Sequence, residues 1–167
     1  MKKIDLTMNE EINDEIKAPL WMLLELTHKC PLECPYCYNQ LDFAKIDDKM
    51  KKEDWLRVIE EAREMGVVQI GFSGGEPLLN KDLPELIKKA SGLGFYTNLI
   101  TSGVGAEEGL VKKLKEAGLK NVQIGIQSHD KDMITLLTNN KTAYEQKLNF
   151  IQEVKKRGYN IIPLDKL

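Results

Sequence analysis

Apolar residues along the chain form short continuous runs that alternate with longer stretches of helical spacing. The runs at 20–26, 67–72, 95–101 and 121–127 have the length and apolar content of buried strands. Apolar side chains that recur every three or four residues predict helices over 53–65, from about 82 to 94, over 106–117 and over 142–157. A short helix is predicted over 130–138, and a fifth strand opens at 159–162.

This alternation of strands and helices predicts an α/β fold made of βα repeats around a parallel sheet. Glycines close most of the helices, and the crossovers are expected to be right-handed. A complete eightfold βα barrel takes about 250 residues, so a chain of 167 residues has room for about four complete units.

The apolar side chains that face the core can also be predicted. The inward face of the last helix is predicted to hold Leu148, Ile151 and Val154, and Trp21 and Trp55 are assigned to the core.

Composition and charge narrow the class of protein without indicating a reaction. The 24 basic and 26 acidic residues give a net charge of −2, so no basic surplus points to nucleic acid. The sequence contains no apolar run of membrane-spanning length. Residues 1–18 are polar and aperiodic, which predicts a flexible lead-in to a single domain over 19–167. Because the first residues lack the apolar stretch of a signal peptide, we expect a cytoplasmic protein.

All three cysteines of the chain lie in one loop, directly after the first predicted strand. Cys30, Cys34 and Cys37 have the spacing C-x3-C-x2-C. An odd number of clustered cysteines in a reducing compartment favours metal binding or catalysis over disulfides. The loop opens at the carboxyl end of a strand, which is where parallel α/β folds place their active sites.

Two kinds of metal site are compatible with this loop. Thiolates are soft ligands that suit zinc or iron–sulfur clusters. A structural zinc site needs four protein ligands, and His28 is the one histidine near enough in sequence to complete a Cys3His set. An iron–sulfur cluster with four irons usually takes four thiolates. With three, one iron would stay open for a substrate.

The C-x3-C-x2-C motif with an aromatic residue before its last cysteine resembles the signature of the radical S-adenosylmethionine (radical SAM) superfamily. The resemblance implies that Cys30, Cys34 and Cys37 hold a 4Fe–4S cluster whose open iron binds SAM. It implies that Tyr36 lies beside the adenine. It also implies a partial, six-stranded βα barrel, of which this chain would hold about four units.

Further motifs follow the next three predicted strands. Gly74, Gly75 and Glu76 resemble the GGE motif of the same family, which implies that they hold the SAM ammonium group. Glycine allows close backbone approach, and a carboxylate suits an ammonium partner. Ser102 and Gln127 follow the third and fourth strands, and the resemblance implies contacts with the SAM carboxylate and ribose. Ordinary polar strand ends would look the same.

Between about residues 20 and 159 the sequence is similar to the PqqA peptide cyclases, radical SAM enzymes of pyrroloquinoline quinone biosynthesis. The resemblance implies a precursor peptide as substrate, cross-linked between a glutamate and a tyrosine. It further implies a small peptide chaperone similar to PqqD and an electron donor as partners, with no nucleic acid or membrane. Another peptide-modifying radical SAM protein is an alternative.

The sequence also departs from that family. Such enzymes carry a C-terminal SPASM domain with further cysteines, whereas this chain has none after Cys37. Tyr38 stands where the family usually has a small residue. We therefore expect an incomplete core domain without the SPASM domain, either a gene fragment or half of a split enzyme. A metal-binding fragment without catalytic activity is the alternative of a different class.

Overall fold

The structure is a computed structural model that describes residues 19–39, 42 and 45–159. Its centre is a four-stranded parallel sheet with the order β1-β2-β3-β4. Each strand pairs with the next along the chain, so the sheet winds in one direction, as a βα barrel does, and does not reverse as a doubly wound sheet does. The strands are β1 (Trp21–Glu25), β2 (Gln69–Ser73), β3 (Tyr96–Thr101) and β4 (Asn121–Ile124).

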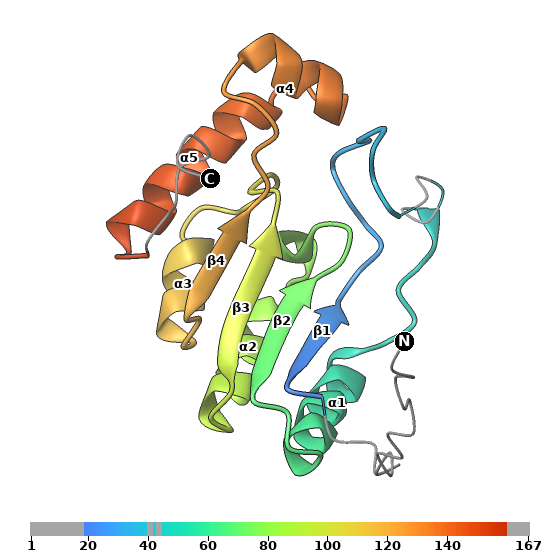
Figure 1. Cartoon of the computed structure of the whole chain (residues 1–167), viewed down its shortest axis with the longest axis vertical. Coiled ribbons are helices and arrows are strands. Elements are labelled where there is room, and N and C mark those ends of the chain that lie inside the picture. Colours follow the sequence, from blue (N-terminus) through green and yellow to red (C-terminus); the bar gives the residue numbers. More distant parts are fainter. Residues whose placement is uncertain (1–18, 40–41, 43–44, 160–167) are drawn as a thin grey trace, which may run out of the picture.

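Between consecutive strands the chain forms helices that lie behind the sheet in Figure 1, and two further helices follow β4. The helices are α1 (Lys52–Glu64), the short 3-10 helix η2 (Pro77–Leu79), α2 (Leu83–Gly92), α3 (Leu110–Glu116), α4 (Lys131–Thr138) and α5 (Ala143–Lys156). This arrangement confirms the predicted α/β class and the partial-barrel architecture. The fifth predicted strand and the lead-in fall mostly or wholly outside the described residues; Tyr159 is described and is buried.

The main hydrophobic core lies between the sheet and helices α1, α2, α3 and α5. The strand register aligns Leu24, Phe72, Leu99 and Val122 across all four strands, and every one of them is buried. Fully burying an apolar side chain of this size contributes about 1.5–3 kcal/mol. Because side chains alternate along a strand, burying these four residues also determines which residues point to the opposite face of the sheet. It determines in the same way how the strand ends that build the site are oriented.

The opposite face of the sheet is more polar and more exposed. Trp21 is 45% exposed on it, so the prediction that Trp21 belongs to the core is wrong, whereas Trp55 is half-buried against the core. Asn98, which β3 buries on this face, accepts a hydrogen bond of 2.7 Å from the Asn121 amide. Polar side chains thus occupy the inner face that a barrel would enclose.

Two element boundaries and one buried helix face differ from the predictions. The third helix starts at Leu110 instead of residue 106, because Gly109 precedes it with φ +76°, a left-handed conformation that interrupts helical geometry. Strand β4 ends at Ile124, three residues early. In α5 the buried stripe runs through Lys147, Phe150 and Val154, so the prediction of an inward Leu148 is wrong.

Candidate metal and cofactor site

The cysteine loop leaves β1 and crosses the carboxyl edge of the sheet. Cys30 and Cys34 are half-buried and Cys37 is exposed, and all three are free thiols. A tight turn draws the last two together, because the Cys37 amide donates to the Cys34 carbonyl at 3.0 Å. The structure thus brings the three predicted ligands into one loop at the expected edge.

A small hydrophobic cluster separate from the main core anchors this loop. Leu32, between the first two cysteines, is 7% exposed and packs with Val104, Ile134 and Ala143. Cys30 and Cys34 pack against the same cluster. Burying Leu32 therefore sets the depth at which these two thiols sit.

The segment between α4 and α5 clamps the loop by hydrogen bonds. The Asn140 amide donates to the Pro31 carbonyl at 3.0 Å, and the Glu33 backbone N–H donates to the Thr138 carbonyl at 3.0 Å. The Asn139 amide donates to the Glu33 carboxylate at 2.6 Å. These contacts join parts of the chain that lie more than a hundred residues apart.

Asp48 holds the start of the loop from the other side. Its carboxylate accepts from the Thr27 hydroxyl at 2.6 Å and from the His28 backbone N–H at 2.9 Å. Asp48 stands among charged residues, and nothing in the sequence pattern separates this aspartate from its neighbours. The structure shows that it positions the residues that lead into the cysteines.

The glycine pair after β2 packs directly on the cysteine loop. The Gly75 N–H donates to the Thr27 carbonyl at 2.7 Å, and the Glu76 N–H donates to the Lys29 carbonyl at 2.9 Å. A Cβ at Gly75 would lie 2.5 Å from the Lys29 oxygen, and one at Gly74 would lie 2.5 Å from the Thr27 oxygen. Gly74 also has φ +131°, which side-chain-bearing residues rarely adopt. Both glycines are therefore required for contact between the two loops.

Glu76 is fully buried and links the ends of β2 and β3. Its carboxylate accepts from the Thr101 hydroxyl at 2.6 Å, the Leu78 N–H at 3.0 Å and the Ser102 N–H at 2.8 Å, and from the Ser102 hydroxyl. Burial raises the pKa of Glu76, and these hydrogen bonds oppose the rise. The structure therefore brings Ser102 to Glu76, and a direct contact of the Glu76 side chain with an ammonium group stays a prediction.

Gln127 lies apart from this network. It follows the end of β4 and is exposed at the same edge of the sheet. Tyr36 is also exposed, and burial together with a hydrogen bond to Cys34 raises the pKa of its phenol. Both side chains are thus accessible from the edge on which the cysteine loop lies.

The surroundings of Cys30 decide how its thiol ionises. Burial raises the pKa of Cys30 to about 11; the nearby Glu76, Cys34 and Cys37 act in the same direction, while a backbone hydrogen bond at Leu32 opposes them. Cys30 is therefore a neutral thiol at pH 7 unless a metal takes the place of its proton.

The three cysteines lie near one another without converging on one point. Within residues 19–39, 42 and 45–159, no three histidine, cysteine, aspartate or glutamate side chains form a group that could hold one metal ion. Cys34 and Cys37 nevertheless lie near enough to Cys30 to raise its pKa. The zinc site with His28 and the iron–sulfur cluster both stay predictions at this point.

Lys147 is a further residue at this edge of the sheet, and it was not predicted from the sequence as part of the site. It lies on the inner side of α5 and is 3% exposed. Its ammonium donates to the Ser102 carbonyl at 2.8 Å and to the Gly125 carbonyl at 2.7 Å. A lysine on an amphipathic helix normally lies on the solvated side, so the sequence around Lys147 does not indicate that it is buried.

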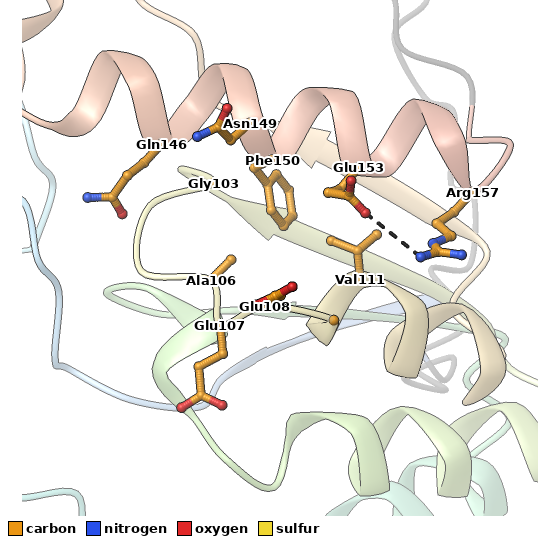
Figure 2. A pocket seen from close by; sticks show the side chains of 11 residues that line it. Gly103, Ala106, Glu107, Glu108, Val111, Gln146, Asn149, Phe150, Glu153 and Arg157 are labelled. Atoms are coloured by element: carbon orange, nitrogen blue, oxygen red, sulfur yellow. Dashed lines mark ion pairs between the residues drawn. The ribbon is translucent and has the colours of Figure 1, made fainter.

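A cavity of about 470 Å³ lies between the loop after β3 and α5 (Figure 2). Phe150 and Val111 form apolar parts of its wall, and Glu107, Glu153 and Arg157 form polar parts. No cysteine lines it, and neither does Glu76. This cavity is therefore separate from the cysteine loop.

In the described part of the chain, no helix has the length and apolar character needed to cross a membrane.

A protein-family model and several solved structures are similar to this chain. The family model described as "Radical SAM superfamily" matches residues 24–164. Among solved structures, Streptococcus suis SuiB bound to the precursor peptide SuiA superposes with a TM-score of 0.75 at 19% identity, over 86% of this chain and 32% of that one. Native anSMEcpe with bound AdoMet gives 0.67 at 21% identity, over 85% and 42%. Methylornithine synthase (PylB) gives 0.64 at 14% identity, over 86% and 43%.

These similarities establish a shared fold. In each superposition, the matched region makes up very different shares of the two chains. Most of this chain is covered in each superposition, whereas it spans only about a third to two fifths of the length of those three proteins.

Proposed function

The chain belongs to the radical SAM superfamily, and from this premise we propose that Cys30, Cys34 and Cys37 bind a 4Fe–4S cluster with one open iron for SAM. The observation that carries the proposal is the set of three free thiols in one loop, packed against Gly-Gly-Glu at the carboxyl ends of parallel strands. When bound, the cluster supplies the electron that cleaves SAM into methionine and a 5′-deoxyadenosyl radical.

The contacts with SAM would come from four places on this edge. Tyr36 would lie beside the adenine, and the backbone of residues 74–76 would accept from the SAM ammonium group. Ser102 and Gln127 would contact the carboxylate and ribose. The exposed positions of Tyr36 and Gln127 and the place of Ser102 at the end of β3 support this assignment.

The chain's own residues orient the ligand loop. Asp48 fixes the residues before Cys30, and Leu32 buries the segment between the first two thiols. The protein thus holds its ligands in place before any cofactor binds, which lowers the ordering cost of binding.

For the substrate we propose a precursor peptide. SuiB, a structural relative, was solved with its precursor peptide SuiA, and the motif set is similar to that of the PqqA peptide cyclases. The finer proposal is a glutamate–tyrosine cross-link in a PqqA-like peptide, presented by a PqqD-like chaperone with a separate electron donor in the cytoplasm. We further propose that residues 19–167 form the SAM-cleaving core and residues 1–18 its lead-in.

Anaerobic reconstitution with iron and sulfide, followed by EPR of the dithionite-reduced protein with and without SAM, tests the first proposal. We expect a reduced-cluster signal that shifts when SAM is added, and no cluster in Cys34→Ala. Bound zinc without a cluster would contradict the proposal. A cluster signal indifferent to SAM would support the second candidate, a metal-binding protein without catalytic activity.

The peptide proposal needs its own measurement. The reconstituted protein is incubated with SAM, reductant and a PqqA-like peptide, and the products are analysed by mass spectrometry. We expect 5′-deoxyadenosine together with a peptide that has lost two hydrogen atoms. Formation of 5′-deoxyadenosine with an unchanged peptide would keep SAM cleavage and reject this substrate.

A further inference from the structure

Lys147 connects the ends of two strands at the edge of the sheet that the cysteine loop crosses. Its ammonium donates to the carbonyls of Ser102 and Gly125, which directly follow β3 and β4. Ser102 in turn donates to Glu76, the last residue of the Gly-Gly-Glu motif. One side chain of α5 thereby joins β4, β3 and the loop that supports the cysteines.

The chemistry of this contact is unusual for a structural lysine. Buried charges in proteins are normally paired with an opposite charge, because an isolated ion is costly to remove from water. The two acceptors that Lys147 contacts are neutral carbonyls. Replacing a buried ion with a well-packed apolar side chain is often neutral or stabilising in proteins. A buried ammonium at the mouth of the fold therefore suggests a role beyond packing.

The groups that influence this ammonium belong to the proposed site. Burial lowers the pKa of Lys147, whereas Cys34, Glu76 and Cys30 act in the opposite direction and favour its charged form. These groups lie on two segments, the cysteine loop and the turn after β2, so Lys147 interacts with more than one neighbour. The packing agrees, because Ala143, one turn before Lys147 on α5, belongs to the small cluster against which Cys30 and Cys34 pack. In a buried setting such charges interact strongly even without contact.

We propose that Lys147 is a positioning residue for the cluster site, which ties the ends of β3 and β4 together and places a positive charge beside the cysteine thiolates, so that the bound cluster is easier to reduce. This inference rests on the proposed function. A cluster gains negative charge on reduction, and a nearby buried cation stabilises the reduced form more than the oxidised form. The effect belongs to the charge itself and does not require contact with SAM.

The test is an EPR-monitored redox titration of the reconstituted protein and a set of matched variants. Lys147→Met removes both the charge and the hydrogen bonds, Lys147→Gln keeps donors without charge, and Lys147→Arg keeps the charge. Lys155→Met, which removes an exposed charge from the same helix, serves as the control. Circular dichroism and urea unfolding of the metal-free proteins establish that each variant folds.

We expect the Met and Gln variants to lower the equilibrium constant for reduction about tenfold, which for a one-electron couple is about 59 mV towards more negative potential. The Arg and Lys155 variants should keep the wild-type potential. A cluster-loaded Met or Gln variant with the wild-type potential would overturn the inference. If neither neutral variant folds, the Lys147→Arg protein is the remaining test, and a shifted potential with the charge retained would overturn the electrostatic role.

The two proposals fail in different ways. A wild-type protein that takes up no cluster overturns the proposed function, and this inference with it. A wild-type protein whose cluster forms normally, combined with variants of unchanged potential, overturns the role of Lys147 alone.

Discussion

Replacing Gly75 with alanine should separate the two loops that build the site. The added Cβ would lie 2.5 Å from the Lys29 carbonyl oxygen and 2.6 Å from that of His28. Both are backbone atoms, so no side-chain rotation relieves the overlap. Gly75 is not among the glycines with positive φ, so the substitution tests the space between the loops and not the backbone conformation.

The expected cost follows from the bonds that this separation breaks. The Gly75 and Glu76 amides donate to the cysteine loop at 2.7 and 2.9 Å. A typical hydrogen bond contributes about 0.5–1.5 kcal/mol net, so losing both lowers the free energy of unfolding by about 1–3 kcal/mol. The cysteine loop should then loosen and hold iron less well.

Gly92→Ala is the matched control, because a Cβ there meets no atom within 4 Å at the end of α2. It should change stability by less than about 1 kcal/mol, in the stabilising direction. Urea unfolding of the metal-free proteins and iron content after reconstitution measure both effects. A Gly75→Ala protein with the stability and iron content of the Gly92→Ala control would refute the reasoning.

Three other outcomes are expected. Leu32→Ala should lower the free energy of unfolding by about 2–4 kcal/mol, as judged by urea unfolding, because Leu32 is buried in the small cluster under the loop; an unchanged midpoint would contradict this. In the metal-free protein, iodoacetamide should modify exposed Cys37 fastest and Cys30 slowest, because burial raises the pKa of Cys30 to about 11 and only the thiolate reacts; mass spectrometry of timed samples gives the order, and equal rates would contradict it. Burial raises the pKa of Tyr159 from 10.0 to about 12, so its contribution to stability is complete below pH 10 and falls as the pH rises towards 12; Tyr159→Phe should weaken this alkaline decline in urea unfolding, and an identical decline in both proteins would count against it.

The sequence predicted the elements because their signals are local. Strand and helix spacing, the helix start at Asp130, whose side chain accepts from the Met133 N–H at 2.8 Å, and the placement of the cysteines after β1 can all be read from neighbouring residues. The burial of Lys147 and the exposure of Trp21 cannot, because each depends on which elements the fold brings alongside it.

The same limit applies within the site. Cys30 and the glycine pair stand out because their residue types are rare and closely spaced. Asp48 and Asn140 do not, since a carboxylate or an amide among other polar residues carries no mark of its tertiary partner. The sequence therefore indicated the candidate ligands, and the structure added the residues that hold them in place.

The clamp between the cysteine loop and the segment before α5 also constrains the order of folding. The contacts from Asn139 to Glu33 and from Asn140 to Pro31 close chain segments of 106 and 109 residues. Contacts of such long range form late, because closing a long loop costs chain entropy that earlier local structure must offset. During synthesis the three cysteines emerge from the ribosome well before α4 and α5 exist. The cysteine loop thus stays open until the last helices fold, and during this interval its thiols are exposed to oxidation.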